Sequence, residues 1–319
     1  MFTLRSDRSK KGKELRMVVV ETLQDIMKEN DKVVALEADL GGASGFTKIQ
    51  KTNPDRFIQC GISEANMVGV AAGLSVTGFK PFVHSFGPFA TRRVYDQIFL
   101  SGAYAGNTIN IYGSDPGFTA GPNGGTHTTW EDVALIRAIP NSVICDTADA
   151  VQLEWIIREY ARMEGIHYIR ANRKDVRNVY GEGSTFEIGK GNILKQGEDV
   201  LIITAGQIVS DALDCAEELE KQGISAEVVD MFCIKPIDKE LILNEVKGKK
   251  AVVTFENHSI TGGLGSAVAE VLAENCISVK FKRHGVNECF GQVGTPDFLQ
   301  KEFKLTAEDL KQTVLEVLK

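Results

Sequence analysis

A regular alternation of short apolar runs with longer amphipathic segments constrains this fold more than any other feature. Apolar runs predict buried strands at 33–36, 81–85, 108–112, 143–145, 168–170, 200–204, 226–229, 251–255 and 279–282. Segments with helical spacing predict helices at 15–27, 64–76, 91–104, 130–138, 151–163, 210–221, 239–246, 266–273 and 307–318, the last capped by Thr306. Strands that alternate with helices in this way are typical of a parallel sheet covered on both faces. The predicted fold class is therefore α/β.

One segment interrupts the alternation. Residues 173–198 are polar and contain five glycines, which indicates a linker followed by a short hairpin. The sequence therefore predicts two domains, residues 1–180 and residues 190–319, each a mostly parallel sheet flanked by helices. The length of 319 residues suits two such domains.

Charge and composition exclude several classes of function. The net charge is -7 and no long basic run offsets it, which argues against a nucleic-acid partner. The short basic stretch 5–13 is interpreted as a solvated N-terminal arm. No apolar run approaches the roughly 20 residues that span a bilayer, and the N-terminus has no signal-peptide core. Six scattered cysteines predict a reducing cytoplasm rather than disulfides or a metal site.

Reactive side chains cluster at predicted strand ends of the first domain. In open α/β sheets, ligands bind beyond the carboxyl ends of the strands. Five polar or aromatic residues lie at or after such ends: Glu64, Phe86, Asp115, His127 and Arg173. The second domain has few such residues, so chemistry is expected in the first.

Three motifs carry the candidate site, and each has a simpler explanation. In 61–67, Ser63 could cap a helix while Glu64 complements its dipole. In 83–92, two phenylalanines three residues apart could be core side chains, or an aromatic wall for a flat ligand. The Gly-rich stretch 113–127 could be a flexible loop, but a loop this long in a compact domain is usually functional.

Taken in order, the motifs resemble the transketolase family. They read Gly-Ile-x-Glu-x-Asn-Met, then Ser-Phe-x-x-Phe-x-Thr-Arg, then Gly-Gly-Thr-His followed by the run 131–141. The resemblance covers essentially the whole chain and implies a pyrimidine-binding domain followed by a transketolase C-terminal domain. The Gly-Asp-Gly motif of the family's third domain is absent from this sequence. The resemblance therefore implies one subunit of a split enzyme.

The resemblance implies a set of residues for the cofactor, thiamine diphosphate. Glu64 matches the glutamate that hydrogen-bonds ring nitrogen N1′, and Phe86 and Phe89 match aromatic residues that pack on the pyrimidine. Asp39 matches an aspartate near the cofactor, although it could instead cap a turn. Arg92 is also assigned to the cofactor site, at a position that varies in the family.

A second set is implied for the substrate. His127 matches a histidine that touches the donor hydroxyl beside the carbonyl, which gives it a catalytic role with Glu64. Arg173 and Arg16 match arginines that grip a sugar phosphate, although Arg16 could be an exposed residue of a helix's first turn.

Two positions depart from the family pattern. Asn123 replaces an aspartate that reads a substrate hydroxyl, and Asp115 replaces a histidine that helps to bind phosphate. A carboxylate at 115 would repel a phosphate unless it pairs with Arg173 or Arg92. The two changes argue against the usual pentose-phosphate substrate. The acceptor could instead be an unphosphorylated sugar, a deoxy or branched sugar phosphate, or another anion held differently.

The resemblance implies ketol transfer only after assembly. A partner N-terminal subunit would hold the diphosphate with Mg²⁺ or Ca²⁺, in an α2β2 heterotetramer. Alternatives are the β subunit of a 2-oxo acid dehydrogenase decarboxylase, part of a deoxyxylulose-phosphate synthase, and a non-catalytic scaffold subunit.

Overall fold

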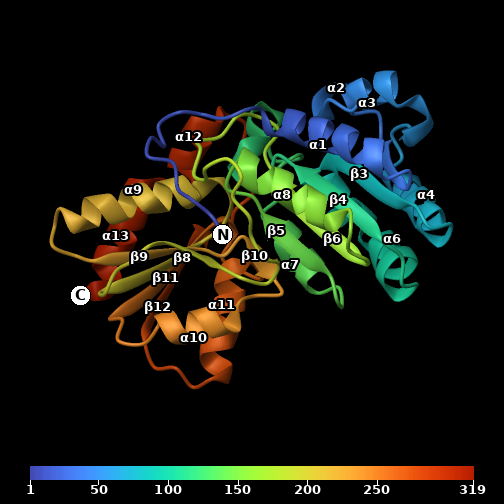
Figure 1. The fold of residues 1–319 in the computed structure, drawn as a ribbon. Helices are drawn as coiled ribbons and strands as arrows, with labels where there is room; N and C mark the ends of the chain where they lie inside the picture. The colour runs from blue at the N-terminus through green and yellow to red at the C-terminus, as the bar shows by residue number, and fades with distance from the viewer.

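Two sheets in separate domains organise the chain (Figure 1). The computed structural model describes residues 1–319. The first sheet has the order β10-β5-β6-β4-β3-β1-β2. Its strands are β1 (Val33–Glu37), β2 (Phe57–Gln59), β3 (Lys80–Phe86), β4 (Ile109–Ser114), β5 (Val143–Asp146), β6 (Ile166–Ala171) and β10 (Cys233–Lys235). All pairs except β10–β5 are parallel, which confirms the predicted sheet.

Helices cover both faces of the first sheet. Helices α1 (Leu15–Glu29) and α8 (Ala150–Tyr160) share one apolar core, which buries Leu15, Leu23 and Ile157 completely. Burying one such side chain contributes about 1.5–3 kcal/mol. The other face packs against α4 (Glu64–Val76), α7 (Asp132–Arg137) and the π-helical segment Ile98–Tyr104. Three further short helices, α2 (Gly41–Ser44), α3 (Thr47–Thr52) and α5 (Gly87–Ala90), lie in the loops.

The second sheet is smaller, with the order β12-β11-β8-β9-β7. Its strands are β7 (Asn192–Lys195), β8 (Val200–Thr204), β9 (Ala226–Asp230), β11 (Ala251–Ser259) and β12 (Lys280–Val286). Its helices are α9 (Val209–Glu220), α10 (Lys239–Glu245), α11 (Leu264–Glu274), α12 (Pro296–Glu302) and α13 (Ala307–Leu318). Thr306 caps α13 in a capping box with Asp309, as predicted.

Two predicted elements are wrong. Residues 91–104 do not form one helix: a 3-10 turn (Arg92–Val94) leads into the single turn α6 (Tyr95–Gln97) and then the π-helical segment. The predicted hairpin within 173–198 does not form, because β7 pairs antiparallel with β9 instead. This partner lies more than thirty residues downstream, and a local pattern cannot indicate it.

The two domains are joined by more than the linker. Strand β10 leaves the second domain and pairs with β5, so that it forms an edge strand of the first sheet. The sequence predicted a solvated N-terminal arm, but the arm packs against the rest of the chain. Its Arg8 pairs with Asp214 at 3.2 Å and Glu217 at 2.6 Å on α9, and Leu4 bridges to Tyr180. The arm therefore lies across both domains.

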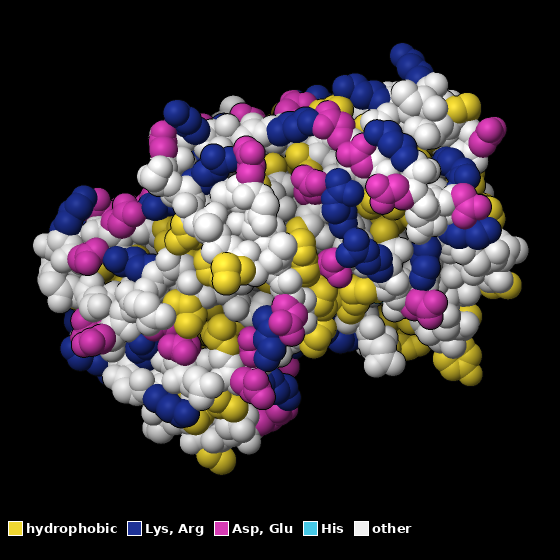
Figure 2. Space-filling view, viewed as in Figure 1, with side chains coloured by type: hydrophobic (Ala, Val, Ile, Leu, Met, Phe, Trp, Pro, Cys, Tyr) yellow, Lys and Arg dark blue, Asp and Glu magenta, His cyan; other side chains and the backbone are white.

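The surface carries both signs of charge. In Figure 2, Lys and Arg side chains are interspersed with Asp and Glu over both domains. None of the helices is both long and apolar enough to cross a membrane. All six cysteines are unpaired thiols, three of them buried (Cys145, Cys215 and Cys233).

Candidate active site

The predicted site residues meet at one edge of the first sheet. Strands β1, β3, β4 and β6 are parallel neighbours, so their carboxyl ends lie side by side. These ends carry Asp39, Phe86, Asp115 and Arg173 in order across the sheet. Asp39 and Asp115 adopt left-handed backbone conformations, with φ of 62° and 54°, a strain that concentrates at functional sites.

Glu64 is buried at the first residue of α4. Its side chain is 5% exposed, and its Oε1 accepts a 2.6 Å hydrogen bond from Nη1 of Arg93. The side chain of Ser63 makes no capping bond, so the simple capping explanation fails for Ser63. Gln59 ties this corner together, because its Oε1 accepts hydrogen bonds from the N–H groups of Asp39 and Gly61 at 2.9 and 3.0 Å.

Phe86, Phe89 and His127 form an aromatic cluster. The ring of His127 lies edge-on to both phenylalanines, with centroids 5.3 Å from Phe86 and 5.0 Å from Phe89. The two phenylalanine centroids are 6.3 Å apart. The predicted aromatic wall and the predicted histidine therefore come from separate segments of the chain and meet at one place.

Arg93 is a site residue that the sequence patterns did not indicate. Its guanidinium carbon lies 3.7 Å from the centroid of Phe89 while Nη1 contacts Glu64. Arg92, the arginine assigned to the cofactor from sequence, instead pairs with Glu131 at 2.7 Å. The Arg-Arg pair was visible, but the 3-10 turn that directs the two side chains apart was not.

His127 is poised as a neutral imidazole. Burial lowers its pKa below the usual value of 6.5, and the nearby positive charges of Arg93 and Arg173 lower the pKa further. Its Nδ1 lies 2.9 Å from the hydroxyl of Thr126. A neutral ring can donate a hydrogen bond from one nitrogen and accept at the other.

Buried Asp115 and partly buried Arg173 form an ion pair at the ends of β4 and β6. Nε of Arg173 contacts Oδ2 of Asp115, and the backbone N–H of Arg173 donates a 3.0 Å hydrogen bond to Oδ1 of Asp115. Burial raises the pKa of Asp115, while Arg173 opposes that rise. The Arg173 guanidinium also lies over Phe86 at 4.7 Å. The carboxylate at 115 thus pairs with Arg173, one of the two partners the sequence offered.

Arg16 and Asn123 lie near the site, but neither side chain points into it. The backbone N–H of Arg16 donates to the carbonyl of Arg173 at 3.1 Å, which brings the start of α1 to this edge. Its guanidinium contacts Glu14 at 2.8 Å. Asn123 is exposed at the end of the 3-10 segment Gly117–Asn123.

A buried polar chain beneath the site was also missed. His84 is fully buried, with Nδ1 2.7 Å from Glu37 Oε1 and Nε2 2.9 Å from Ser114 Oγ. Glu37 also accepts the N–H of Leu40 at 2.9 Å. This chain connects the turn at the end of β1 to the residue that precedes Asp115. The alternating apolar pattern hid it, because these polar side chains lie inside the strands.

The second domain clamps the start of the loop that ends at His127. Asn257 on β11 donates to the carbonyl of Pro116 at 3.1 Å and accepts the N–H of Phe118 at 3.2 Å. Nη2 of Arg170 donates a 2.7 Å hydrogen bond to the backbone carbonyl oxygen of Asn257. Arg170 also binds the buried carboxylates of Asp132 and Asp146 at 2.7 and 2.8 Å.

Glycines allow a close seam between this loop and residues 291–296. A Cβ at Gly125 would lie 2.5 Å from the carbonyl oxygen of Gly291, and a Cβ at Gly291 would lie 2.4 Å from Thr128. The loop is therefore held between the two domains rather than mobile on the surface.

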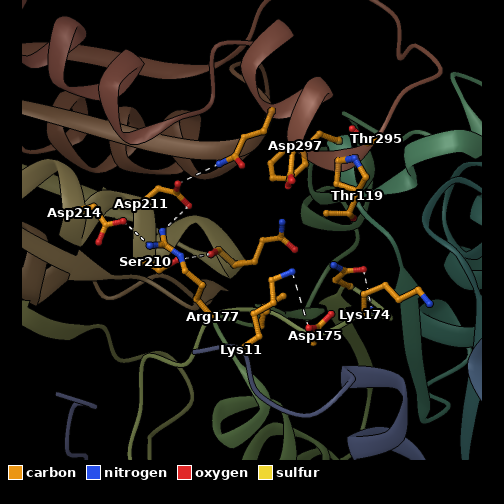
Figure 3. Close-up of a pocket in the computed structure, with 16 residues that line it drawn as sticks. Lys11, Thr119, Lys174, Asp175, Arg177, Ser210, Asp211, Asp214, Thr295 and Asp297 are labelled. Atoms are coloured by element: carbon orange, nitrogen blue, oxygen red, sulfur yellow. Dashed lines mark hydrogen bonds and ion pairs between the residues drawn. The ribbon is translucent and has the colours of Figure 1, made fainter. Parts of the chain in front are cut away.

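A polar cleft of about 640 Å³ is lined by residues of both domains (Figure 3). It shares Phe118 and Thr119 with the His127 loop. Arg177 reaches across it to Asp211 at 3.3 Å and contacts Asp214. Since Glu64, Phe86 and His127 do not line this cleft, it is distinct from the candidate active site.

Comparison with known proteins identifies the relatives of this chain. Residues 11–179 match the family model of the transketolase pyrimidine binding domain, and residues 189–310 match that of the transketolase C-terminal domain. The chain is 45% identical to the 6-deoxy-6-sulfo-D-fructose transketolase subunit SqwH of a Clostridium species, over 95% of this chain and 94% of the relative. It is 33% identical to one of the apulose-4-phosphate transketolase subunits of Phocaeicola vulgatus, over 95% and 97%.

A solved structure extends the comparison to the fold. A split-gene transketolase, described as an inactive beta4 tetramer, matches with a TM-score of 0.89 and 40% identity, over 96% of this chain and 99% of that one. The matches run through both domains and nearly end to end. This chain belongs to the transketolase family, as the C-terminal subunit of the split form.

Proposed function

We propose that this chain supplies the pyrimidine-side half of a thiamine diphosphate site in a two-subunit transketolase. In this proposal residues 1–180 form the pyrimidine-binding domain and residues 190–319 the C-terminal domain. The observation that carries it is the buried carboxylate of Glu64, which Arg93 links to the ring of Phe89 in the aromatic cluster. A carboxylate next to an aromatic face suits a flat ring with N–H donors at its edge.

The residues present fit the cofactor ring. The Arg93 guanidinium, a planar cation with N–H groups at its edge, already sits on Phe89 and bonds Glu64. This corner of the site therefore accommodates a flat nitrogen donor. Bound thiamine diphosphate would supply the electron sink for breaking and forming the carbon–carbon bond beside a carbonyl. The partner subunit would hold its diphosphate and a Mg²⁺ or Ca²⁺ ion.

The residues of this chain would divide the remaining work. Glu64 would share a proton with ring nitrogen N1′, while Phe86 and Phe89 hold the ring and exclude water. Neutral His127 would hydrogen-bond the donor hydroxyl beside the carbonyl. Asp39 lies at the neighbouring strand end, where it would face the cofactor and the partner.

Arg173 is the proposed contact for the far end of the substrate. Asp115 engages its Nε, so its other N–H groups are left to bind an anion. The relatives named above are called sulfo-fructose and apulose-4-phosphate transketolase subunits, and both names describe sugars with an anionic group. We therefore propose a ketose with a sulfonate or phosphate end as donor, other than xylulose 5-phosphate. Arg16 and Asn123, whose side chains do not reach the site in the free chain, would complete the substrate contacts once the subunits have assembled.

Assembly and location belong to the same proposal. The partner would be an N-terminal transketolase subunit, in an α2β2 heterotetramer. On α4, exposed Ala65, Gly69 and Gly73 would permit close helix contact with it. The cysteine usage of the sequence supports a cytoplasmic enzyme.

Titration calorimetry with thiamine diphosphate and Mg²⁺ tests the proposal. We expect binding only when this chain is mixed with its partner, and we expect Glu64→Gln to weaken it strongly. The surface change Glu154→Gln serves as the matched control. Tight binding by this chain alone would contradict a split site, and no binding by the mixture would favour a scaffold subunit.

A further inference from the structure

Arg93 makes two contacts that coincide with those expected of the cofactor ring. Its Nη1 donates to Glu64 at 2.6 Å, and its planar group lies 3.7 Å over the Phe89 centroid. A guanidinium presents N–H groups in its plane, and a flat aminopyrimidine presents an N–H at N1′ when it holds the proton that it shares with Glu64. The two groups therefore need the same carboxylate of Glu64 and the same face of Phe89. Arg93 and the cofactor ring cannot occupy this place at the same time.

Burial makes this exchange reasonable. Glu64 is 5% exposed, and a buried carboxylate without a partner is strongly destabilising. The other cations of the site have partners, since Arg92 pairs with Glu131 and Arg173 with Asp115. Arg93 is thus the cation that satisfies Glu64.

Arg93 can also leave without burying its charge. Its side chain is 45% exposed, so the guanidinium already reaches water. It sits in the 3-10 turn Arg92–Val94 rather than in a regular helix. When Arg93 moves away, the chain loses one half-exposed ion pair. Glu64 gains the cofactor ring as a new partner in the same place.

We propose that Arg93 is an internal stand-in for the cofactor ring. It holds Glu64 in the free subunit and is exchanged for the aminopyrimidine when the cofactor binds between the subunits. The inference rests on the proposed function, because it takes Glu64 as the partner of the ring. Cofactor affinity is then reduced by the fraction of sites that Arg93 occupies.

The decisive experiment uses this chain assembled with its partner subunit. Calorimetry at saturating Mg²⁺ should give a dissociation constant for thiamine diphosphate about three- to tenfold lower for Arg93→Gln than for the wild type. Arg158→Gln, which removes a surface arginine that is 37% exposed, should leave the constant unchanged. An unchanged or higher constant for Arg93→Gln would overturn the proposal, because a purely structural or cofactor-assisting arginine gives that result.

A second measurement uses this chain alone and the ring alone. Ligand-observed NMR with 4-amino-2,5-dimethylpyrimidine should show stronger binding to the Arg93→Gln chain than to the wild type, and none to Glu64→Gln. Equal binding to wild type and Arg93→Gln would overturn the exchange. If the wild-type complex binds no cofactor, the proposed function fails and this measurement still decides the role of Arg93. If the complex binds cofactor and Arg93→Gln does not tighten it, only the role of Arg93 fails.

Discussion

Asn257, on β11 of the second domain, donates a 3.1 Å hydrogen bond to the carbonyl oxygen of Pro116 in the loop that ends at His127. A residue of one domain therefore holds the start of a loop whose end lies in the candidate active site of the other. We expect this contact to help to position His127, because the loop passes between both domains.

Replacing Asn257 with alanine should impair catalysis more than cofactor binding. The change frees Pro116 and Phe118 and loosens the loop, and misplacing a catalytic group by about 1 Å can cost a hundredfold in rate. We expect kcat of the reconstituted enzyme to fall at least about tenfold, with the cofactor dissociation constant unchanged. Asn244→Ala, at an exposed end of α10, is the control. A parallel loss of cofactor affinity would refute the positioning role.

Arg170→Met should destabilise the chain without any partner. Arg170 is 1% exposed and neutralises both Asp132 and Asp146, so its loss leaves two buried carboxylates without a cation. Breaking a buried pair in this way costs about 3–5 kcal/mol. Urea unfolding measures it, with the surface change Arg158→Met expected to cost less than about 1 kcal/mol. Equal effects of the two changes would contradict the network.

Asp230 should make stability fall as pH rises. Burial raises its pKa from 3.8 to about 7, although Tyr180 and Gln152 donate hydrogen bonds to it. Between those values the folded state binds a proton that the unfolded state has lost. The unfolding free energy therefore decreases with pH, by at most about 1.4 kcal/mol per pH unit. Above pH 7 this contribution levels off.

Asp230→Asn isolates that contribution, because the amide cannot ionise. The stability of the variant relative to the wild type should increase from pH 4 to pH 7 and then stay constant. Urea unfolding across this pH range provides the measurement. A difference that does not change with pH would show that Asp230 ionises normally in the folded chain.

Gly291→Ala should disturb the seam that carries His127. The new methyl group would lie 2.4 Å from Cβ of Thr128, the neighbour of the histidine. Overpacking of this kind costs about 1–3 kcal/mol, and we expect a matching drop in melting temperature together with a lower kcat. Gly42→Ala, where no atom lies within 4 Å, should change neither.

The acid limb of the pH–rate profile should lie below pH 6.5. Burial, Arg93 and Arg173 all lower the pKa of His127, so the neutral ring persists into more acidic solution. The kcat/KM of the reconstituted enzyme against pH measures this limb, and His127→Asn should remove it. A limb above pH 6.5 that disappears in this variant would contradict the electrostatics of the site.

Sequence patterns predicted the parts of the fold that depend on local periodicity. Helices α4 and α13 run as predicted, because Glu64 and Thr306 mark their starts in the sequence. The pattern failed where a partner lies far along the chain. Nothing in Cys233–Lys235 says that these three residues complete the first sheet rather than the second.

The residues of the candidate site also fall into those that the sequence could predict and those that it could not. The rule that ligands bind at strand ends was enough to predict that Phe86, Asp115 and Arg173 lie at one edge of the sheet. It could not find Asn257, which acts from the other domain. It also could not choose between Arg92 and Arg93, since an irregular turn decides which of the two side chains faces Glu64.

Strand β10 has a consequence for how the two domains can be inherited. It hydrogen-bonds along β5, next to the strand that ends at Ala171, so residues 233–235 are part of the first sheet although they are encoded beyond the start of the second domain. A gene break between the domains would expose the edge of β5 and separate Asn257 from the loop it holds. The two domains should therefore behave as one evolutionary unit, which is recombined or transferred as a whole.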